Sequence, residues 1–275
     1  MRITAIFLVF LLCSCADVPE KIREYTSVEV DVLHQDSISI RAIEIMDGSL
    51  AFAANNGVFG NIDLRTGKVR TAVQTYDSIL PEFRAIAHTS TDFFMLSAGN
   101  PALLYKTGDK GNMELVYSEI GAGVFYDAMA FWNDLEGLAI GDSMDGCLSI
   151  IITRDGGKNC SKLSCDELPQ AIVGEGAFAA SNTNIAIIGD TAWIATTQGR
   201  VLRTPDRGRS WEVVQTPMES QAEAQGIFSI AFYNADEGFA IGGDYTRPEI
   251  KRANKARSQE GGRTWHVVAD GDSPG

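Results

Sequence analysis

A short strand-like phrase that recurs five times constrains the fold of this chain more than any other feature. The five copies are residues 39–43, 82–86, 125–129, 175–179 and 227–231. Their third residues lie 43, 43, 50 and 52 residues apart. A period of roughly 20 to 50 residues is typical of solenoids and propellers, in which each repeat is one supersecondary unit. We therefore expect a fold built from one repeated unit.

Each phrase is followed by further short apolar strands. The second strand is clearest in residues 133–141 and 234–242, which match closely, the third in residues 199–204 and the fourth in residues 211–214. No helical stretch separates them. Four short strands in every unit predict an all-β fold.

The turns between the third and fourth strands carry the most specific signal. They share Ser/Thr-x-Asp/Glu-x-Gly, and they begin 26, 27, 29 and 23 residues after the third residue of their phrase. The strong copies are Thr153-Asp155-Gly157, Thr204-Asp206-Gly208-Trp211 and Ser258-Glu260-Gly262-Trp265, and the weaker copy is Thr107-Asp109-Gly111. The hydroxyl and the carboxylate can accept backbone N–H bonds, the glycine supplies a positive φ, and the tryptophan packs below the turn. We predict that these acids stabilise turns and have no catalytic role.

This turn pattern resembles the Asp-box, or BNR repeat, of sialidase-type β-propellers. The whole spacing resembles the photosystem II stability/assembly factor family of propeller proteins, over about residues 30 to 270. The resemblance implies a β-propeller of four-stranded blades, about seven in the family, of which about five are present here. The sequence departs from the pattern at three places. Cys160 stands at a tryptophan position, Glu260 replaces Asp, and the first blade has only a loose turn at Asp63 to Gly67.

The last residues of the sequence have the composition of a loop and follow directly after a fourth strand. We therefore expect residues 28–275 to form a propeller domain that is incomplete at its C-terminal end. Val28 to Leu33 would normally close the ring against the absent part.

In this family the Asp-boxes lie on the rim away from the ligand, while the starts of the innermost strands line a central funnel. The resemblance implies six funnel candidates: Arg41, Arg84, Tyr126, Asp127, Glu175 and Ser229. Two guanidinium groups in an acidic protein could bind a carboxylate or an acidic peptide segment. Alternatively they pair with Asp127 and Glu175 in a solvated ion network. The long link of residues 244–257 gathers five basic residues, and it is either a contact region or a flexible loop.

The N-terminus resembles that of a bacterial lipoprotein. Residues 3–12 are apolar except for Thr4 and follow Arg2, and this run is too short to span a bilayer as a mature helix. The next residues complete a sequence that resembles a lipobox, Leu12-Cys13-Ser14-Cys15. We predict that residues 1–14 are a signal peptide, that Cys15 is lipidated, and that residues 15–27 form the lipidated end and a tether. A plain signal peptide is the alternative.

Three cysteines remain in the folded part: Cys147, Cys160 and Cys165. In an exported protein we expect a disulfide within this trio. The sequence does not say which pair forms it, and three reduced thiols are an equal alternative.

Composition and motifs exclude several functions. The chain of 275 residues has 36 Asp+Glu against 23 Lys+Arg and a formal net charge of −13, so a nucleic-acid partner is not expected. His34, His88 and His266 are isolated, and the glycine pairs have no strand-to-helix context, so neither a metal nor a cofactor is expected. The chain also lacks a Ser/His/Asp arrangement and the Arg-Ile-Pro motif of sialidases, and no catalytic residue is assigned.

These observations predict a non-enzymatic β-propeller that acts as a binding or assembly scaffold in the cell envelope. It would be exported and held on the periplasmic or outer-membrane face by its lipid alone, and its partner would be a protein or a peptide. The alternative is a sialidase-like or other glycoside hydrolase that acts on a glycan. Asp127 with Glu175 would then supply the pair of carboxylates.

Overall fold

The structure is a computed structural model that describes residues 26–272. The chain divides into two units, residues 1–33 and 34–275, and the β-sheets all belong to the second. The predicted signal peptide, Cys15 and most of the predicted tether lie outside the described residues. Val28 to Leu33, predicted to close a ring, form no strand, and their apolar side chains are exposed. Across residues 26–272 we find no helix of the length and apolarity that crossing a bilayer requires.

Five four-stranded sheets make up the second unit. The first contains β1 (Ile40–Met46), β2 (Ser49–Ala54), β3 (Val58–Asp63) and β4 (Val69–Val73). The second contains β5 (Phe83–His88), β6 (Phe93–Ser97), β7 (Ala102–Thr107) and β8 (Met113–Glu119). The third contains β9 (Tyr126–Phe131), β10 (Gly137–Met144), β11 (Cys147–Thr153) and β12 (Cys160–Lys162). The fourth contains β13 (Ile185–Ile188), β14 (Thr191–Ala195), β15 (Arg200–Thr204) and β16 (Glu212–Gln215). The fifth contains β17 (Gln225–Phe232), β18 (Gly238–Asp244), β19 (Lys255–Ser258) and β20 (His266–Val267). The helix η1 (Cys165–Glu167) is a single 3₁₀ turn.

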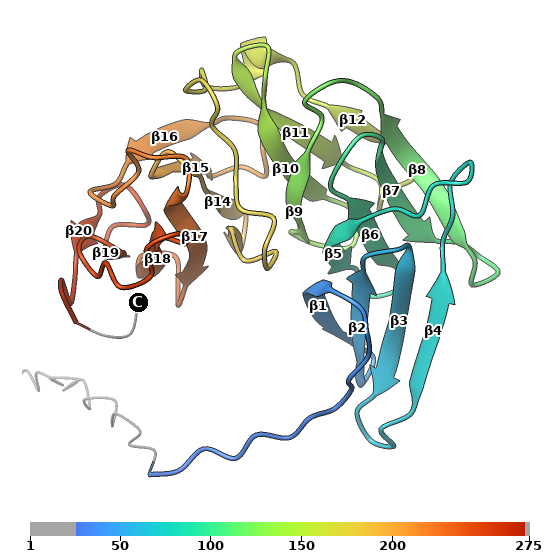
Figure 1. The fold of residues 1–275 in the computed structure, drawn as a ribbon. Helices are drawn as coiled ribbons and strands as arrows, with labels where there is room; N and C mark the ends of the chain where they lie inside the picture. Colours follow the sequence, from blue (N-terminus) through green and yellow to red (C-terminus); the bar gives the residue numbers. More distant parts are fainter. Residues whose placement is uncertain (1–25, 273–275) are drawn as a thin grey trace, which may run out of the picture. The chain divides into compact units, whose positions relative to one another are not determined.

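The strands of each sheet pair antiparallel in chain order, so every sheet is a meander. The sheets follow one another around an arc, with β1, β5, β9 and β17 toward its inner side (Figure 1). The predictions of an all-β fold and of about five four-stranded units are confirmed. We call the sheets blades one to five.

The hydrophobic core lies between successive blades. Side chains alternate between the two faces of a strand, so Met95 packs with blade one while Phe94 and Leu96 pack against blade three. Each of the four core clusters combines residues of two neighbouring blades. Within the described residues, no such cluster joins blade one to blade five. Each blade is therefore stabilised by burial against its neighbours in the chain.

Blade four departs from the predicted repeat. Its innermost strand is Ile185–Ile188, whereas the repeated phrase at residues 175–179 is not part of a strand. The phrase still pairs locally, because the Thr197 amide donates to the carbonyl of Gly176 at 2.9 Å. The intervening residues form a loop in place of the continuous innermost strand of the other blades.

Two of the three cysteines are joined. A disulfide links Cys147 at the start of β11 to Cys165 in η1, and Cys160 is free. Cys160 packs against the core between blades two and three, and burial raises the pKa of its thiol to about 11. The structure thus selects one of the pairings that the sequence left open.

Candidate binding face

Four innermost strands carry a β-bulge near their first residues. In each, the register with the second strand shifts by one residue, which leaves one residue unpaired: Arg41, Arg84, Asp127 and Phe228. A bulge bends the strand and re-aims the side chain of the extra residue. Three of the predicted funnel residues therefore occupy equivalent positions on β1, β5 and β9. In β17 the bulged residue is Phe228, and the predicted Ser229 is its paired and partly buried neighbour.

The two predicted arginines have different surroundings. Arg41 is exposed and makes no ion pair with another described residue. The guanidinium carbon of Arg84 lies 5.8 Å from the centre of the Phe125 ring, within the range of a cation–π contact. Neither arginine forms a salt bridge with Asp127 or Glu175 within residues 26–272, so the predicted ion network is not present as direct pairs.

Asp127 is fully buried beside a second acid, Asp142 of β10. Neither carboxylate oxygen of Asp127 has a hydrogen-bond partner among the described residues. Burial, reinforced by the charge of Asp142, raises the pKa of Asp127 well above its usual range, and the charge of Arg84 opposes this only in part. Burial also raises the pKa of Asp142 to about 6. These environments favour the neutral form of Asp127.

Glu175 and Tyr126 are occupied by structural contacts. The fully buried carboxylate of Glu175 pairs with Arg200 and accepts bonds from the Thr196 hydroxyl at 2.8 Å and the Ile172 amide at 2.9 Å. The hydroxyl of Tyr126 donates to Glu119 at 2.6 Å inside the core between blades two and three. With Glu175 held in this way and Asp127 buried, the pair proposed for glycoside hydrolysis is not arranged as two accessible carboxylates.

Aromatic side chains gather at the same end of blades four and five. The rings of Phe178 and Phe228 meet edge to face with centroids 4.8 Å apart, and Tyr245 approaches Phe178 at 6.1 Å. Tyr245 is 61% exposed. Asp127 of blade three lies near enough to Arg84 for the arginine's charge to oppose part of the rise in its pKa. We call Arg41, Arg84, Phe125, Phe178, Phe228 and Tyr245 the aromatic–arginine face.

Exposed apolar side chains surround this face on the links between blades. Because each link runs from an outermost strand to the start of the next innermost strand, all links lie at the same end of the blades. Three of them carry exposed apolar residues: Ile79 and Leu80, Ile120, and Ile172 and Val173. Apolar side chains that recur around one end of a domain are typical of a protein-binding surface.

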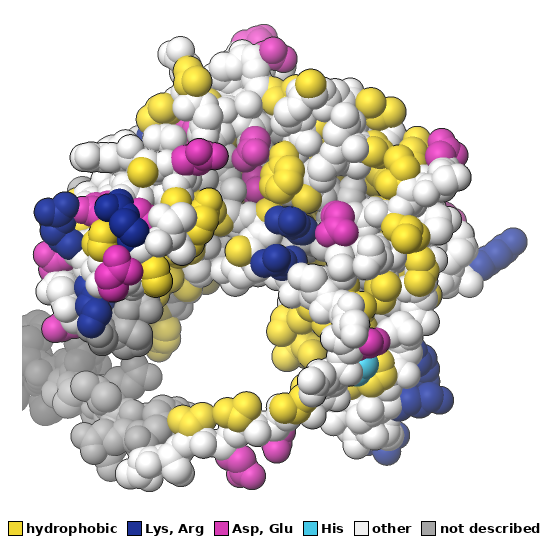
Figure 2. Space-filling view, in the orientation of Figure 1, with side chains coloured by type: hydrophobic (Ala, Val, Ile, Leu, Met, Phe, Trp, Pro, Cys, Tyr) yellow, Lys and Arg dark blue, Asp and Glu magenta, His cyan; other side chains and the backbone are white. Residues whose placement is uncertain are grey.

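The basic link of residues 244–257 is largely neutralised by acids. Arg247 pairs with Asp244 at 2.8 Å, and Arg252 pairs with Glu219. Figure 2 shows Lys and Arg side chains (dark blue) interspersed with Asp and Glu side chains (magenta) over the fifth blade, at the left of the view. The hydrogen bonds from Thr246 and Arg247 also lower the pKa of Asp244. The link is therefore folded onto its blade, and its positive charge is mostly compensated.

The opposite end of the blades carries the predicted Asp-box turns. In blade four the Gly208 amide donates to Thr204 Oγ1 at 2.6 Å, while Asp206 Oδ1 accepts from the Arg209 and Ser210 amides at 3.0 and 2.8 Å. Equivalent bonds join Gly157 to Thr153 at 2.9 Å and Gly262 to Ser258 at 2.8 Å. Asp155 and Glu260 likewise bond within their own turns, to Asn159 and Thr264. The three glycines have φ of 76°, 79° and 78°.

The weaker copy at Thr107 forms a different turn. Thr107 pairs with Met113, six residues on, whereas Thr153 of blade three pairs with Cys160, seven residues on. The Thr107 hydroxyl donates to the carbonyl of Phe93 at 3.1 Å instead of accepting from a turn amide. The hairpin is one residue too short for the box, and Asp109 has no hydrogen bond among the described residues. Met113 occupies the place that Trp211 and Trp265 hold in blades four and five.

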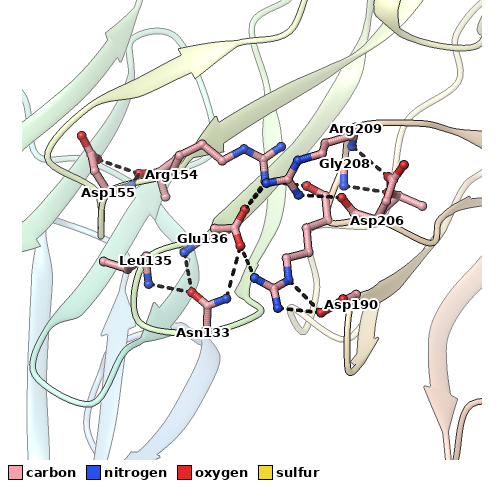
Figure 3. Close-up of polar contacts among 12 residues, drawn as sticks. Asn133, Leu135, Glu136, Arg154, Asp155, Asp190, Asp206, Gly208 and Arg209 are labelled. Atoms are coloured by element: carbon pink, nitrogen blue, oxygen red, sulfur yellow. Dashed lines mark hydrogen bonds and ion pairs between the residues drawn. The ribbon is translucent and has the colours of Figure 1, made fainter.

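A cluster of charged residues joins the turns of blades three and four (Figure 3). Glu136 Oε1 accepts from Arg154 and Arg209, both at 2.9 Å, and Oε2 accepts from Arg207. Burial raises the pKa of Glu136, but the bonds from Arg207, Asn133 and Arg209 lower it to about 2. Arg207 also pairs with Asp190 at 2.6 Å.

Sequence reasoning missed this Glu136 cluster, although its signal was present. Arg154 lies between the hydroxyl and the acid of one box, Arg207 and Arg209 flank the glycine of the next, and Glu136 belongs to the repeated second-strand motif. Residues at the variable positions of one turn lie close to the neighbouring blade. With this assumption the sequence would have placed these four residues together. Over residues 26–272 no three His, Cys, Asp or Glu side chains are grouped as a metal site would require.

Comparison with solved structures identifies the fold. The chain is similar to a chain of the mitotic checkpoint complex, with a TM-score of 0.56 and 10% identity over 86% of this chain and 66% of that one. It is also similar to the β-propeller domain of Cps50 (Swd1) from Myceliophteria thermophila, with a TM-score of 0.50 and 13% identity over 81% and 66%. YCF48 bound to D1 peptide matches with a TM-score of 0.41 and 13% identity over 84% and 80%. The fold is that of a β-propeller.

No family model matches the sequence, and no curated protein matches it. The predicted membership of the BNR or photosystem II assembly factor family therefore stays a prediction. Identities of 10% to 13% support the fold alone.

Proposed function

We propose that this protein is a non-enzymatic binding propeller that holds a segment of a protein partner across its aromatic–arginine face. The observation that carries the proposal is the bulge repeated in four blades, which brings Arg84 over Phe125 and Phe228 against Phe178 at one end of the domain. Aromatic and arginine side chains are enriched in the centres of protein interfaces and supply most of their binding energy.

The chemistry of the face indicates the kind of segment that it fits. The rings of Phe178, Phe228 and Tyr245 offer contact area to apolar side chains, while Arg41 and Arg84 offer donors to a carboxylate. Burial and the charge of Asp142 raise the pKa of Asp127, and Arg84 forms no ion pair with it among the described residues. The favoured partner is therefore a polypeptide segment that combines apolar side chains with an acidic group.

We infer the location from the N-terminal sequence. The resemblance of residues 12–15 to a lipobox supports an exported protein that is anchored in the cell envelope by a lipid on Cys15. Mass spectrometry of the N-terminal peptide of the membrane-extracted protein tests this. Diacylglycerol on Cys15, lost with Cys15→Ser, is the expected result, and a soluble exported protein that begins at another residue would contradict the anchor.

Site-specific crosslinking from the face, followed by pull-down from envelope extracts, tests the binding function. Arg84→Ala and Tyr245→Ala should each lower the yield of a reproducible adduct about tenfold. Arg263→Ala and Tyr233→Ala are matched controls, since Tyr233 is 76% exposed and lies at the opposite end of blade five. Equal yields from all four variants would contradict the proposal, as would release of sugar from a glycan panel by the purified protein.

A further inference from the structure

A pocket opens between blades one and two, at the end of the blades that carries the turns. Its volume is about 460 Å³. Blade one contributes Ala51, Phe59 and Asn61, and blade two contributes Phe93 and Met113. A volume of a few hundred Å³ with a mostly apolar lining and a few polar groups is typical of ligand sites.

In blades four and five, a tryptophan occupies the corresponding position in the outer hairpin. Trp265 is 6% exposed and packs in the core between these blades, and its indole N–H donates to the carbonyl of Gly262 at 3.0 Å. Trp211 packs against the core between blades three and four. Blade two has Met113 at this position, so the pocket lacks the ring that its own hairpin would otherwise provide.

On the face toward blade two, the second strand of blade one also lacks a ring, because Phe52 lies on its other face. In blades two and four this strand carries Phe94 and Trp193, which pack under the box glycine of the next blade. A Cβ atom on Gly157 would lie 2.4 Å from Phe94, and one on Gly262 would lie 2.5 Å from the indole nitrogen of Trp193. A Cβ atom on Gly111 of blade two would meet nothing within 4 Å. Ala51 lines the pocket in blade one with a single methyl group.

A polar group beside the pocket has no partner. The Oδ1 atom of Asn61 is buried, and no described group donates to it. An acceptor in this state costs free energy unless a donor reaches it. An indole ring carries one such donor on a large apolar body, as Trp193 shows by donating to the carbonyl of Gly261 at 2.8 Å.

We propose that this pocket binds the indole ring of a tryptophan side chain of a partner polypeptide. The ring takes the place between the blades that rings of this chain fill elsewhere. Its N–H donates to Oδ1 of Asn61 after the side-chain amide, whose oxygen is buried in the unbound protein, turns toward the pocket. The open space beside Gly111 leaves room for the partner's main chain. The site lies at the opposite end of the blades from the aromatic–arginine face, so the two proposals stand independently.

Calorimetric titration with N-acetyl-L-tryptophanamide tests the site directly. Ala51→Phe and Met113→Trp fill the pocket from its two sides and should abolish binding while the protein stays folded, as judged by thermal unfolding. Arg263→Ala, on a turn of blade five, is the control and should bind like the parent protein. Undiminished binding by both filling variants, or no binding by the parent protein, would overturn the proposal.

A sulfur analogue tests the contact to Asn61. Asn61→Leu should weaken binding of the indole amide by about threefold to tenfold, the effect of one hydrogen bond. The benzothiophene analogue, which lacks the N–H group, should bind the parent protein more weakly by a similar factor and should be insensitive to Asn61→Leu. If Asn61→Leu weakened binding of the indole amide and of the benzothiophene analogue equally, this would contradict the hydrogen bond. If free indole bound and the amide did not, this would contradict a polypeptide partner.

Discussion

The side-chain amide of Asn182 hydrogen-bonds both main-chain groups of Met129. Its Oδ1 accepts from the Met129 amide at 2.9 Å, and its Nδ2 donates to the Met129 carbonyl at 3.2 Å and to the Ile86 carbonyl at 3.0 Å. Asn182 lies in the loop that replaces the start of the innermost strand of blade four. Because the inner edges of β5 and β9 have no neighbouring strand, this side chain satisfies groups that a strand would otherwise pair. The loop thus ties blades two and three to blade four.

We predict that Asn182→Ala lowers the free energy of unfolding by about 2–3 kcal/mol, because three hydrogen bonds are lost and alanine is disfavoured at the φ of 63°. Asn182→Gly loses the same hydrogen bonds, but glycine adopts a positive φ without strain. This variant should therefore have a higher free energy of unfolding than Asn182→Ala. Urea unfolding measures both. Ser181→Ala, at an exposed neighbour, should change the free energy by less than about 0.5 kcal/mol. A neutral Asn182→Ala would contradict the bridging role.

The Glu136 cluster gives a second stability prediction. Glu136→Gln removes the acid that three guanidinium groups share, and should lower the free energy of unfolding by about 1–2 kcal/mol at neutral pH. Since the native pKa of Glu136 is lowered to about 2, its contribution is complete above its unfolded pKa of about 4.3 and is lost as pH falls toward 2. Unfolding of both proteins at pH 7 and pH 2.5 measures this. Glu212→Gln, whose side chain is 53% exposed beside Arg203, is the matched control.

The two kinds of outer turn should respond differently to the same change. Asp206→Ala removes an acceptor from two backbone amides and should lower the free energy of unfolding by about 1–2 kcal/mol. Asp109→Ala should be within about 0.5 kcal/mol of the parent protein, because the shorter hairpin does not use this carboxylate. Thermal unfolding of the two variants side by side measures the difference, and equal effects would contradict the assignment of box and non-box turns.

Two acids of blade three, the buried Asp127 and the partly buried Asp142, predict a stability that depends on pH. Asp142 has a native pKa of about 6, above its unfolded value of about 3.9, so its native state holds the proton more tightly. Its stabilising contribution is full below about pH 4 and is lost as pH rises toward 6. Asp142→Asn should therefore be more stable than the parent protein at pH 7 by about 1 kcal/mol, with no gain at pH 4. Asp127→Asn should raise the stability at pH 7 in the same way. A higher stability of Asp142→Asn than of the parent protein at pH 4 would contradict this account.

Cys160 should react slowly with alkylating reagents. With a pKa of about 11, its thiolate fraction at pH 8 is about a hundredfold lower than at the ordinary value of 9.0. Iodoacetamide labelling followed by peptide mass spectrometry should modify Cys160 only after unfolding. Cys147 and Cys165 should be modified only after unfolding and reduction. Fast labelling of native Cys160 would contradict its burial.

Much of the fold could be predicted from local patterns. Alternating apolar residues and turn signals specify strands and hairpins over a few residues, so the units and three of the Ser/Thr-x-Asp/Glu-x-Gly turns were predictable. Thr107-x-Asp109-x-Gly111 satisfies the same pattern, but the turn needs one more residue before Met113. The pattern records residue types, whereas hairpin length is set by which residues pair across the turn.

The residues of the candidate site were less predictable from sequence than the fold, because their contacts depend on tertiary structure. The equivalent positions of Arg41, Arg84 and Asp127 were predictable, because the same bulge occurs at the same point of their three repeats. Glu175 was misplaced because blade four has a loop there, and its carboxylate meets Arg200 instead of a funnel. The disulfide partner of Cys147 was also undecided, since the sequence does not say which cysteine lies beside it.

Sequence by itself determined the repeated four-stranded unit of this protein, since strand and turn preferences act between residues close in the chain. Only the tertiary structure decided what lies between the units: the Asn182 bridge, the arginines around Glu136, and the pocket beside Ala51. Each of these joins residues of different blades. Their meeting depends on how side chains fill the space between two sheets, which no local pattern encodes.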